Sequence, residues 1–93
     1  MTLIELETCI KLLNAELDVA LTKSDYKKYL RSARWKTRNE LYKEFTGWHC
    51  MRCKKMYTKY LSLHHLRYSN LGREPLEDLI LLCRKCHYII HNF

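Results

Sequence analysis

Four cysteines constrain this chain more than any other feature, because they come in two Cys-x-x-Cys pairs. Cys50 and Cys53 form the first pair, and Cys83 and Cys86 form the second. Zn²⁺ takes four thiolate or imidazole ligands in a tetrahedron, and a Cys-x-x-Cys turn offers two thiolates from one bend. Two such turns brought together by the fold close a four-thiolate site with no open position. The pairs therefore predict one structural zinc ion.

The 29 residues between Cys53 and Cys83 exceed the usual gap of a zinc ribbon, so this segment has room for an element of its own. The alternatives to zinc are four buried thiols, or disulfides in a secreted protein. We see no signal peptide ahead of the first pair, and we therefore expect a reducing, cytoplasmic environment.

The histidines near these cysteines need a separate explanation, because four thiolates already saturate one metal ion. His87 and His91 are four residues apart, so on a helix they project from one face and suit a second ion. His64 and His65 are adjacent and end a segment with strand character at residues 56–63. Neighbouring strand residues point to opposite sides, so both imidazoles can serve one reacting group only where the strand ends.

The residues that follow complete a simple order of elements. Asn70, Gly72 and Pro75 mark a loop, and the apolar run at residues 79–82 predicts a return strand. The order is then strand, loop, strand and helix, with zinc holding the entry to the first strand against the start of the helix.

In this order the motif residues resemble the HNH endonuclease family in its zinc-bound form. The resemblance implies a small α+β fold, with a ββα-metal core and a four-cysteine zinc site, preceded by two or three helices. It also implies an enzyme that hydrolyses phosphodiesters with a divalent ion. It covers residues 26–91 and rests on His64-His65, Asp78-Leu79 and Leu82-Cys83-x-x-Cys86-His87-x-x-x-His91, with Tyr29-Leu30-x-Ser32-x-x-Trp35-x-x-x-Arg38 upstream.

The resemblance also implies a role for each motif residue. His65 matches the general base that activates water, His64 the metal ligand before it, His87 the ligand on the helix, and His91 an extra ligand of some members. The family usually has Asn where this chain has Asp78, and that side chain braces the loop that carries the base. An ionised Asp accepts hydrogen bonds but cannot donate them, so we expect the bracing to be altered here.

The implied reaction gives 5′-phosphate and 3′-hydroxyl ends. His65 takes a proton from water, and the divalent ion stabilises the charge that develops on the phosphate and the leaving oxygen. Imidazole ligands suit transition metals better than Mg²⁺. We therefore expect Mn²⁺, Co²⁺, Ni²⁺ or Zn²⁺ to serve the second site at least as well as Mg²⁺.

The charge of the chain is uneven, with a net −3 in residues 1–20 and +10 in residues 21–93. A strongly basic domain attracts polyanions, and beside a nuclease-like motif this charge predicts double-stranded DNA as the partner. A solvated face without a partner is the alternative. The expected contacts are a helical stripe and two further arginines: Lys27, Arg31, Arg34, Arg38, Arg67 and Arg84.

Residues 1–23 predict an amphipathic helix ahead of a nuclease domain at residues 24–93, the two forming one compact domain. Thr2-x-x-Glu5 is a capping box, and Ser24 or Ser32 can begin later helices before Gly47 ends them. The apolar spacing predicts packing on the domain's own core, and pairing of residues 2–20 with a second copy or a partner protein is the alternative. Apolar residues recur at helical spacing at Leu3, Leu6, Ile10, Leu13, Leu17 and Ala20.

Two other functions stay open beside the endonuclease. One is a zinc-stabilised module that binds nucleic acid without turnover. The other is a subunit of a larger phage or mobile-element complex. No apolar run is long enough for a membrane span, and we expect no membrane partner.

Overall fold

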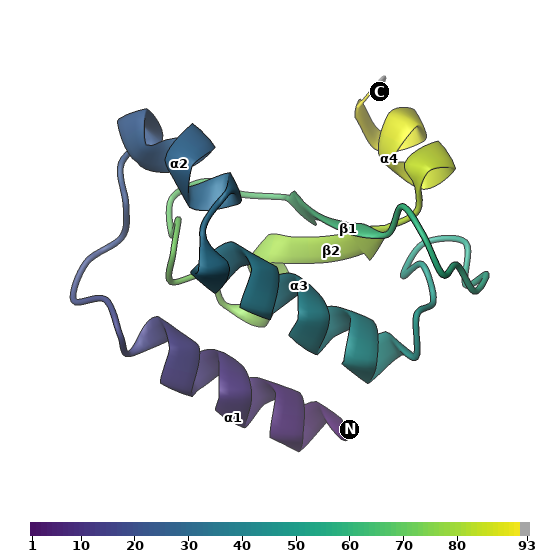
Figure 1. Cartoon of the computed structure of the whole chain (residues 1–93), viewed down its shortest axis with the longest axis horizontal. Helices are drawn as coiled ribbons and strands as arrows, with labels where there is room; N and C mark the ends of the chain where they lie inside the picture. The colour runs from purple at the N-terminus through teal and green to yellow at the C-terminus, as the bar shows by residue number, and fades with distance from the viewer. Residues whose placement is uncertain (92–93) are drawn as a thin grey trace.

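The computed structural model describes residues 1–91 and has the small α+β fold that the motifs predict. Two strands form an antiparallel hairpin, and the helices surround it (Figure 1). The elements in chain order are α1 (Leu3–Asn14), a 3₁₀ turn (Lys23–Asp25), α2 (Tyr26–Leu30), α3 (Ala33–Thr46), β1 (Ser62–His65), a second 3₁₀ turn (Leu76–Asp78), β2 (Leu79–Leu82) and α4 (Arg84–His91).

The hairpin is followed directly by α4, so the predicted order of strand, loop, strand and helix is correct. The first strand differs from the prediction, because it begins at Ser62 instead of residue 56. Tyr60 has a φ of 64°, which interrupts the extended path, and Met56 pairs only with His49 in an isolated bridge. The strand also extends past residue 63, so that His64 and His65 are its last two residues, opposite residues 80 and 79 of β2.

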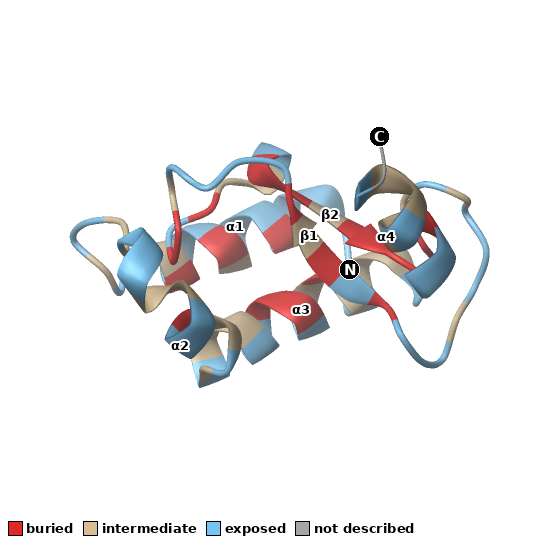
Figure 2. Ribbon diagram, turned by 90° about the horizontal axis from the view of Figure 1, so that it is seen from above, coloured by how far each residue is buried: buried red, intermediate tan, exposed pale blue. Residues whose placement is uncertain are grey.

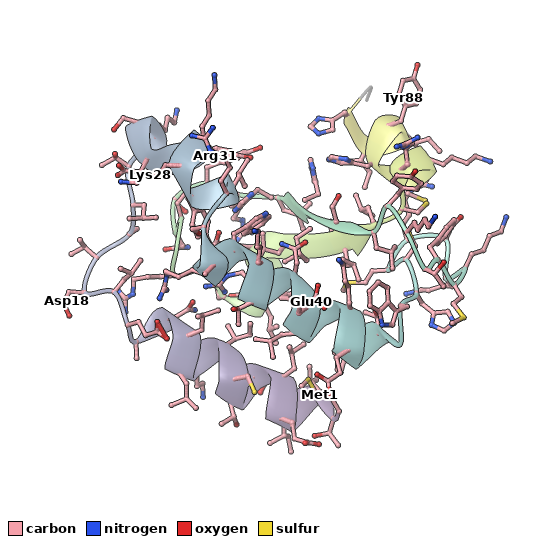
Figure 3. All side chains as sticks on the ribbon, in the orientation of Figure 1. Met1, Asp18, Lys28, Arg31, Glu40 and Tyr88 are labelled. Atoms are coloured by element: carbon pink, nitrogen blue, oxygen red, sulfur yellow. The ribbon has the colours of Figure 1, made fainter. Side chains whose placement is uncertain are left out.

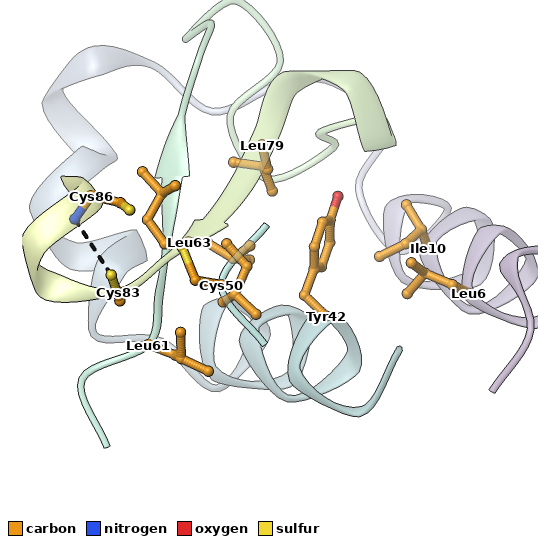
Figure 4. Packing of buried hydrophobic residues seen from close by; sticks show 11 residues of the cluster. Leu6, Ile10, Tyr42, Cys50, Leu61, Leu63, Leu79, Cys83 and Cys86 are labelled. Atoms are coloured by element: carbon orange, nitrogen blue, oxygen red, sulfur yellow. Dashed lines mark hydrogen bonds between the residues drawn. The ribbon is translucent and has the colours of Figure 1, made fainter. Parts of the chain in front are cut away.

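Helix α1 begins with the predicted capping box. The backbone N–H of Glu5 donates to the Thr2 hydroxyl at 3.1 Å, and the Thr2 backbone N–H donates to the Glu5 carboxylate at 3.0 Å. The helix ends at Asn14, well before Ala20, where the predicted apolar stripe ends. Its buried face packs on α3, with Leu6 and Ile10 directed toward Tyr42 (Figure 4). Ile4 and Leu12 on the other side of the helix are exposed, and so is Leu3 in its first turn.

Helix α3 begins and ends where the sequence predicts. The Ser32 hydroxyl accepts a hydrogen bond from the Trp35 backbone N–H at 3.2 Å, and Gly47 ends the helix with a φ of 62°. A left-handed residue at this position is adopted most easily by glycine. Ser24 does not cap a helix; instead Thr22 and Asp25 form the capping box of the first 3₁₀ turn.

The core lies between the hairpin and the two longer helices, and Figure 2 shows the buried faces of α1, α3 and the strands turned toward one another. Leu81 and Leu82 are fully buried, and each buried leucine contributes about 1.5–3 kcal/mol through the hydrophobic effect. The buried cysteines join the same cluster, so the thiols of the two Cys-x-x-Cys pairs and the core are continuous. Within the described residues, no helix combines the length and the apolar character needed to cross a lipid bilayer.

Candidate metal centres and active site

The four paired cysteines meet at the junction of α3, β2 and α4. Their sulfur atoms all lie within 4.8 Å of one another. Each pair is a tight turn. The Cys53 backbone N–H donates to Cys50 Sγ at 3.5 Å, and the Cys86 backbone N–H donates to Cys83 Sγ at 3.4 Å (the dashed line in Figure 4). The cluster thus has the residue types and the spacing of the predicted structural site.

The sulfur separation fits a tetrahedral zinc ion. Zinc–sulfur bonds of about 2.3 Å place the sulfur atoms of a tetrahedral site about 3.8 Å apart. Cys53 Sγ lies 4.0 Å from Cys83 Sγ, close to that separation. These four residues would hold the ion, which would fix the loop after α3 to the start of α4.

The thiols differ in how readily they ionise. The backbone amide of Lys55 lowers the pKa of Cys53 to about 6, whereas burial raises the pKa of Cys86 to about 11. Four neighbouring thiolates repel one another, and a bound cation deprotonates its thiol ligands outright. A divalent cation is therefore the partner that allows all four sulfur atoms to ionise together.

Three histidines form a second cluster across β1 and α4. His64 Nδ1 lies 3.1 Å from His87 Nε2, and His87 Nε2 lies 2.9 Å from His91 Nε2. Metal–nitrogen bonds of about 2.0–2.1 Å place the nitrogen atoms of a tetrahedral site about 3.3 Å apart, so the cluster fits one divalent ion. Because three imidazoles leave at least one position open, this arrangement suits a site that exchanges water or a phosphate oxygen.

Two of these histidines, His64 and His87, have lowered pKa values. Burial, together with the neighbouring imidazoles His87 and His91, lowers the pKa of His64. Burial and His91 lower the pKa of His87 in the same way. Both rings are therefore neutral near pH 7, each with a nitrogen lone pair available to a cation.

His65 is not part of this cluster, because successive residues of β1 face opposite sides. Its side chain is 1% exposed and its Nε2 lies 2.7 Å from Glu74 Oε2. Trp35 stacks on the ring at a centroid distance of 4.8 Å and Tyr68 at 5.2 Å. The structure thus brings together the predicted metal histidines but encloses the predicted base among aromatic rings.

Glu74 connects His65 to a buried polar network. The Arg38 guanidinium is 0% exposed, and its Nε lies 3.3 Å from Glu74 Oε1. Burial alone would raise the pKa of Glu74, but the hydrogen bond with His65, the charge of Arg38 and the hydroxyl of Tyr29 outweigh it and lower the pKa. Glu74 is consequently a carboxylate at neutral pH, and it fixes the orientation of the His65 ring.

Arg38 also ties together three segments that are distant in the sequence. Its Nη2 donates to Asn14 Oδ1 at 2.6 Å and to the Gly72 carbonyl at 3.2 Å, and its Nη1 donates to the Glu74 carbonyl at 3.0 Å. The loop between β1 and β2, which contains Gly72, passes close to the residues after α1. A Cβ at Gly72 would lie 2.7 Å from Leu17 Cδ1. The loop that carries Glu74 is therefore held from both sides.

Asp78 is bonded to the turn after β1 through both its side chain and its backbone. Its carboxylate accepts a hydrogen bond from Asn70 Nδ2 at 2.9 Å, and its own carbonyl accepts from the Leu66 backbone N–H at 2.7 Å. Asn70 supplies the donor that an ionised Asp lacks. The sequence identified Asn70 only as a loop residue, so this pairing was missed.

The predicted DNA-binding stripe on α2 and α3 is wrong in one member. Arg38 is completely buried and bound to Glu74, so it cannot contact a phosphate from the surface. Arg34 is also engaged, since it donates to Glu16 and to the carbonyls of Leu13 and Gly72. The remaining predicted contacts, including the two arginines outside the stripe, are exposed: Lys27, Arg31, Arg67 and Arg84.

The sequence did contain a signal for the buried position of Arg38. Trp35, Arg38, Tyr42 and Phe45 follow helical spacing along α3, so Arg38 falls on the same face as three aromatic residues. A cation on an apolar face requires a buried anion, and Glu74 is that anion. The neighbouring Asn39 is buried as well, and its Oδ1 accepts a hydrogen bond from the Leu63 backbone N–H at 3.0 Å.

A two-stranded hairpin and a helix, with three imidazoles gathered between them and four thiols at their junction, define a small ββα protein with two candidate metal centres. Residues 50–93 match the family model of the HNH endonuclease, which confirms the resemblance of the motif residues. The matched segment contains both cysteine pairs, Asp78 and the clustered histidines, so the similarity to a family of nucleases covers both candidate metal centres. Comparisons with curated proteins and with solved structures found no match.

Proposed function

We propose that this protein is a metal-dependent endonuclease that hydrolyses phosphodiester bonds of DNA. The observation that carries the proposal is the convergence of His64, His87 and His91, whose ligand nitrogens lie within 4.8 Å of one another in a segment of the HNH family. The family supports nuclease chemistry in general, and the positive charge of residues 21–93 supports a nucleic acid as substrate.

His64, His87 and His91 would hold the divalent ion. When bound, such an ion stabilises negative charge on the phosphate and on the leaving oxygen. All three ligands are imidazoles, which favours Mn²⁺, Co²⁺, Ni²⁺ or Zn²⁺ over Mg²⁺. The two centres then have different tasks, since the four thiols close their site and the three imidazoles do not.

His65 is the general base in this proposal, and Glu74 determines which of its nitrogens acts. The carboxylate accepts a hydrogen bond from His65 Nε2, at a distance of 2.7 Å, so Nε2 carries the proton. The lone pair is then on Nδ1, which accepts the proton of the attacking water. A carboxylate behind an imidazole also stabilises the imidazolium that forms.

Access to His65 requires one side chain to move. Tyr68 stacks on the imidazole and is itself 45% exposed, whereas the other stacking ring, Trp35, belongs to α3. We propose that Tyr68 turns away when substrate enters. Asp78 and Asn70 keep the turn after β1 in place meanwhile, through the 2.9 Å hydrogen bond between their side chains.

The test is conversion of supercoiled plasmid to nicked or linear DNA, with and without each divalent metal. His65→Ala should lower the rate by about 10²–10⁴-fold, the usual contribution of a positioned base, while zinc content and DNA affinity are retained. His49→Ala is the matched control, because the exposed His49 ring belongs to neither candidate metal centre and lies 2.9 Å from the Thr46 carbonyl. Asp78→Asn should keep or raise activity, since Asn can accept the same hydrogen bond from Asn70.

Two results would oppose the proposal in different ways. Nicking that is indifferent to His65→Ala would remove the base assignment and leave the nuclease. The enclosure of His65 favours the second candidate function, a module that binds nucleic acid without turnover. Wild-type protein that binds DNA and never cuts it with Mg²⁺, Mn²⁺, Co²⁺, Ni²⁺ or Zn²⁺ would establish that function instead.

A further inference from the structure

A hollow on the outer side of α4 combines aromatic rings with positive charge. It has a volume of about 470 Å³ and lies between the loop before β1 and the first turns of the helix. Figure 3 shows Tyr88 projecting from α4 at this end of the molecule. We call this hollow the aromatic–basic hollow. Its lining residues are Tyr57, Lys59, Tyr60, Arg84, Lys85 and Tyr88.

The aromatic–basic hollow is continuous with the histidine cluster. A smaller hollow of about 290 Å³ shares Tyr60 and Arg84 with it and is also lined by Ser62 and His87. His87 Nε2 lies 3.1 Å from His64 Nδ1, inside the candidate metal centre. A chain bound along this path would therefore reach from the exposed tyrosines to the reacting phosphate.

The chemistry of the lining matches a nucleotide. Every charged residue that lines the hollow is a cation, while Tyr60 and Tyr88 are 64% and 70% exposed. The Arg84 guanidinium lies 4.0 Å from the centroid of the Tyr60 ring, so it stacks on that ring and keeps a positive charge beside it. Aromatic rings bind the faces of bases and cations bind phosphates, and together they are typical of single-strand binding surfaces.

We propose that the aromatic–basic hollow binds an unpaired nucleotide next to the scissile phosphate, so that the preferred substrate is DNA with a single-stranded segment. In a duplex each base is covered by its neighbours on both faces, and a surface tyrosine cannot stack on it unless the base leaves the helix. Tyr60 and Tyr88 can stack on a base that is already unpaired. This inference rests on the proposed nuclease function, which supplies the scissile phosphate.

Binding is measured by fluorescence anisotropy on the zinc-loaded full chain, without added divalent metal. The probes are a labelled single strand, the blunt duplex of the same sequence, and that duplex with a short gap. Wild-type protein should bind the single strand and the gapped duplex more tightly than the blunt duplex. Tyr60→Ala and Tyr88→Ala should each weaken single-strand binding by about 5- to 150-fold, the effect of losing one stacked base, with blunt-duplex binding unchanged.

Trp48→Ala is a matched control. Trp48 is also exposed, has a φ of 63° against 64° for Tyr60, and has a cation, Lys43, 5.1 Å from its ring centroid. Ala has the same Cβ as the residue it replaces at both positions, so the backbone conformation is strained no further. Trp48→Ala should leave all three affinities unchanged, and Tyr60→Phe should retain single-strand binding because the ring remains.

The outcomes separate this inference from the proposed function. Equal affinity of the wild-type protein for the single strand and the blunt duplex would overturn the subsite, even if plasmid is cut. So would a Tyr60→Ala variant that loses the same affinity for the single strand as for the blunt duplex. Discrimination that depends on Tyr60 and Tyr88 without any cutting would support the subsite and overturn the nuclease. Binding of an Asp/Glu-rich peptide with no binding of any oligonucleotide would overturn the subsite and make the hollow a protein-docking surface.

Discussion

Replacing Arg38 with methionine should destabilise the fold more than any other single charge removal in α3. Methionine is similar in length to arginine but has no donors. The change would remove the cation that lies 3.3 Å from Glu74 Oε1, while the Glu74 carboxylate stays fully buried. It would also remove the hydrogen bonds to Asn14 Oδ1 and to the carbonyls of Gly72 and Glu74.

The magnitude follows from the charge left behind. Removing one partner of a buried ion pair costs about 3–5 kcal/mol, because the other charge is left uncompensated. A domain of 93 residues has a free energy of unfolding of about 5–14 kcal/mol in total. Arg38→Met should therefore lower the melting temperature by about 12–40 °C, at about 4–8 °C per kcal/mol.

The assay is urea unfolding followed by circular dichroism at a fixed zinc concentration, since a bound metal contributes to apparent stability. Arg31→Met is the matched control on the exposed side and should change the free energy of unfolding by no more than about 0.5 kcal/mol. Combining Arg38→Met with Glu74→Gln removes both charges and should recover part of the loss. If the free energy of unfolding of Arg38→Met lay within about 0.5 kcal/mol of the wild-type value, which is the range expected of surface substitutions, this reasoning would be refuted.

Three further predictions concern the metals and pH. Cys83→Ser should lose zinc and unfold, because structural zinc supplies about 10–16 kcal/mol in small domains; elemental analysis and circular dichroism check this, and Cys9→Ser, outside the cluster, should keep zinc. His64→Ala combined with His87→Ala should abolish the weaker of two binding phases in a Mn²⁺ titration of zinc-loaded protein, and an unchanged titration would contradict the site. Glu74 has a folded pKa below its ordinary value of 4.5, so its stabilisation is complete above that value and is lost as the pH falls through the folded pKa; acid unfolding of Glu74→Gln should lack this component, and identical pH dependence would oppose it.

The sequence predicted those parts of the fold that depend on local patterns. The capping box at Thr2, the cap at Ser32 and the stop at Gly47 are short-range signals, and each is found in the structure. The antiparallel return strand and α4 were likewise predicted, since a short apolar run and the Cys-His spacing mark them. The convergence of the cysteines and of His64 with His87 followed from the order of these elements.

The remainder depended on contacts between distant residues. Nothing local says that α1 ends at Asn14, because its end is tied to the loop near Glu74, where the Asn14 Nδ2 donates to the Glu74 carbonyl at 3.0 Å. The burial of Arg38 depends on Glu74, 36 residues away. The start of β1 depends on the positive φ of Tyr60. A tyrosine does not by itself indicate a positive φ, so the sequence could not predict where the strand begins. Short-range patterns therefore predicted the elements, and long-range pairing determined which charges face the solvent.

The way Asn14 and Arg38 hold the Glu74 loop limits how this protein can be divided. The match to the HNH family begins at residue 50, yet Arg38 and Asn14, which position the loop, come from before that boundary. Grafting residues 50–93 into a host protein would transfer the four thiols and the three imidazoles intact. It would leave Glu74 without its buried cation, so the graft would carry both candidate metal centres without the rigid orientation of His65.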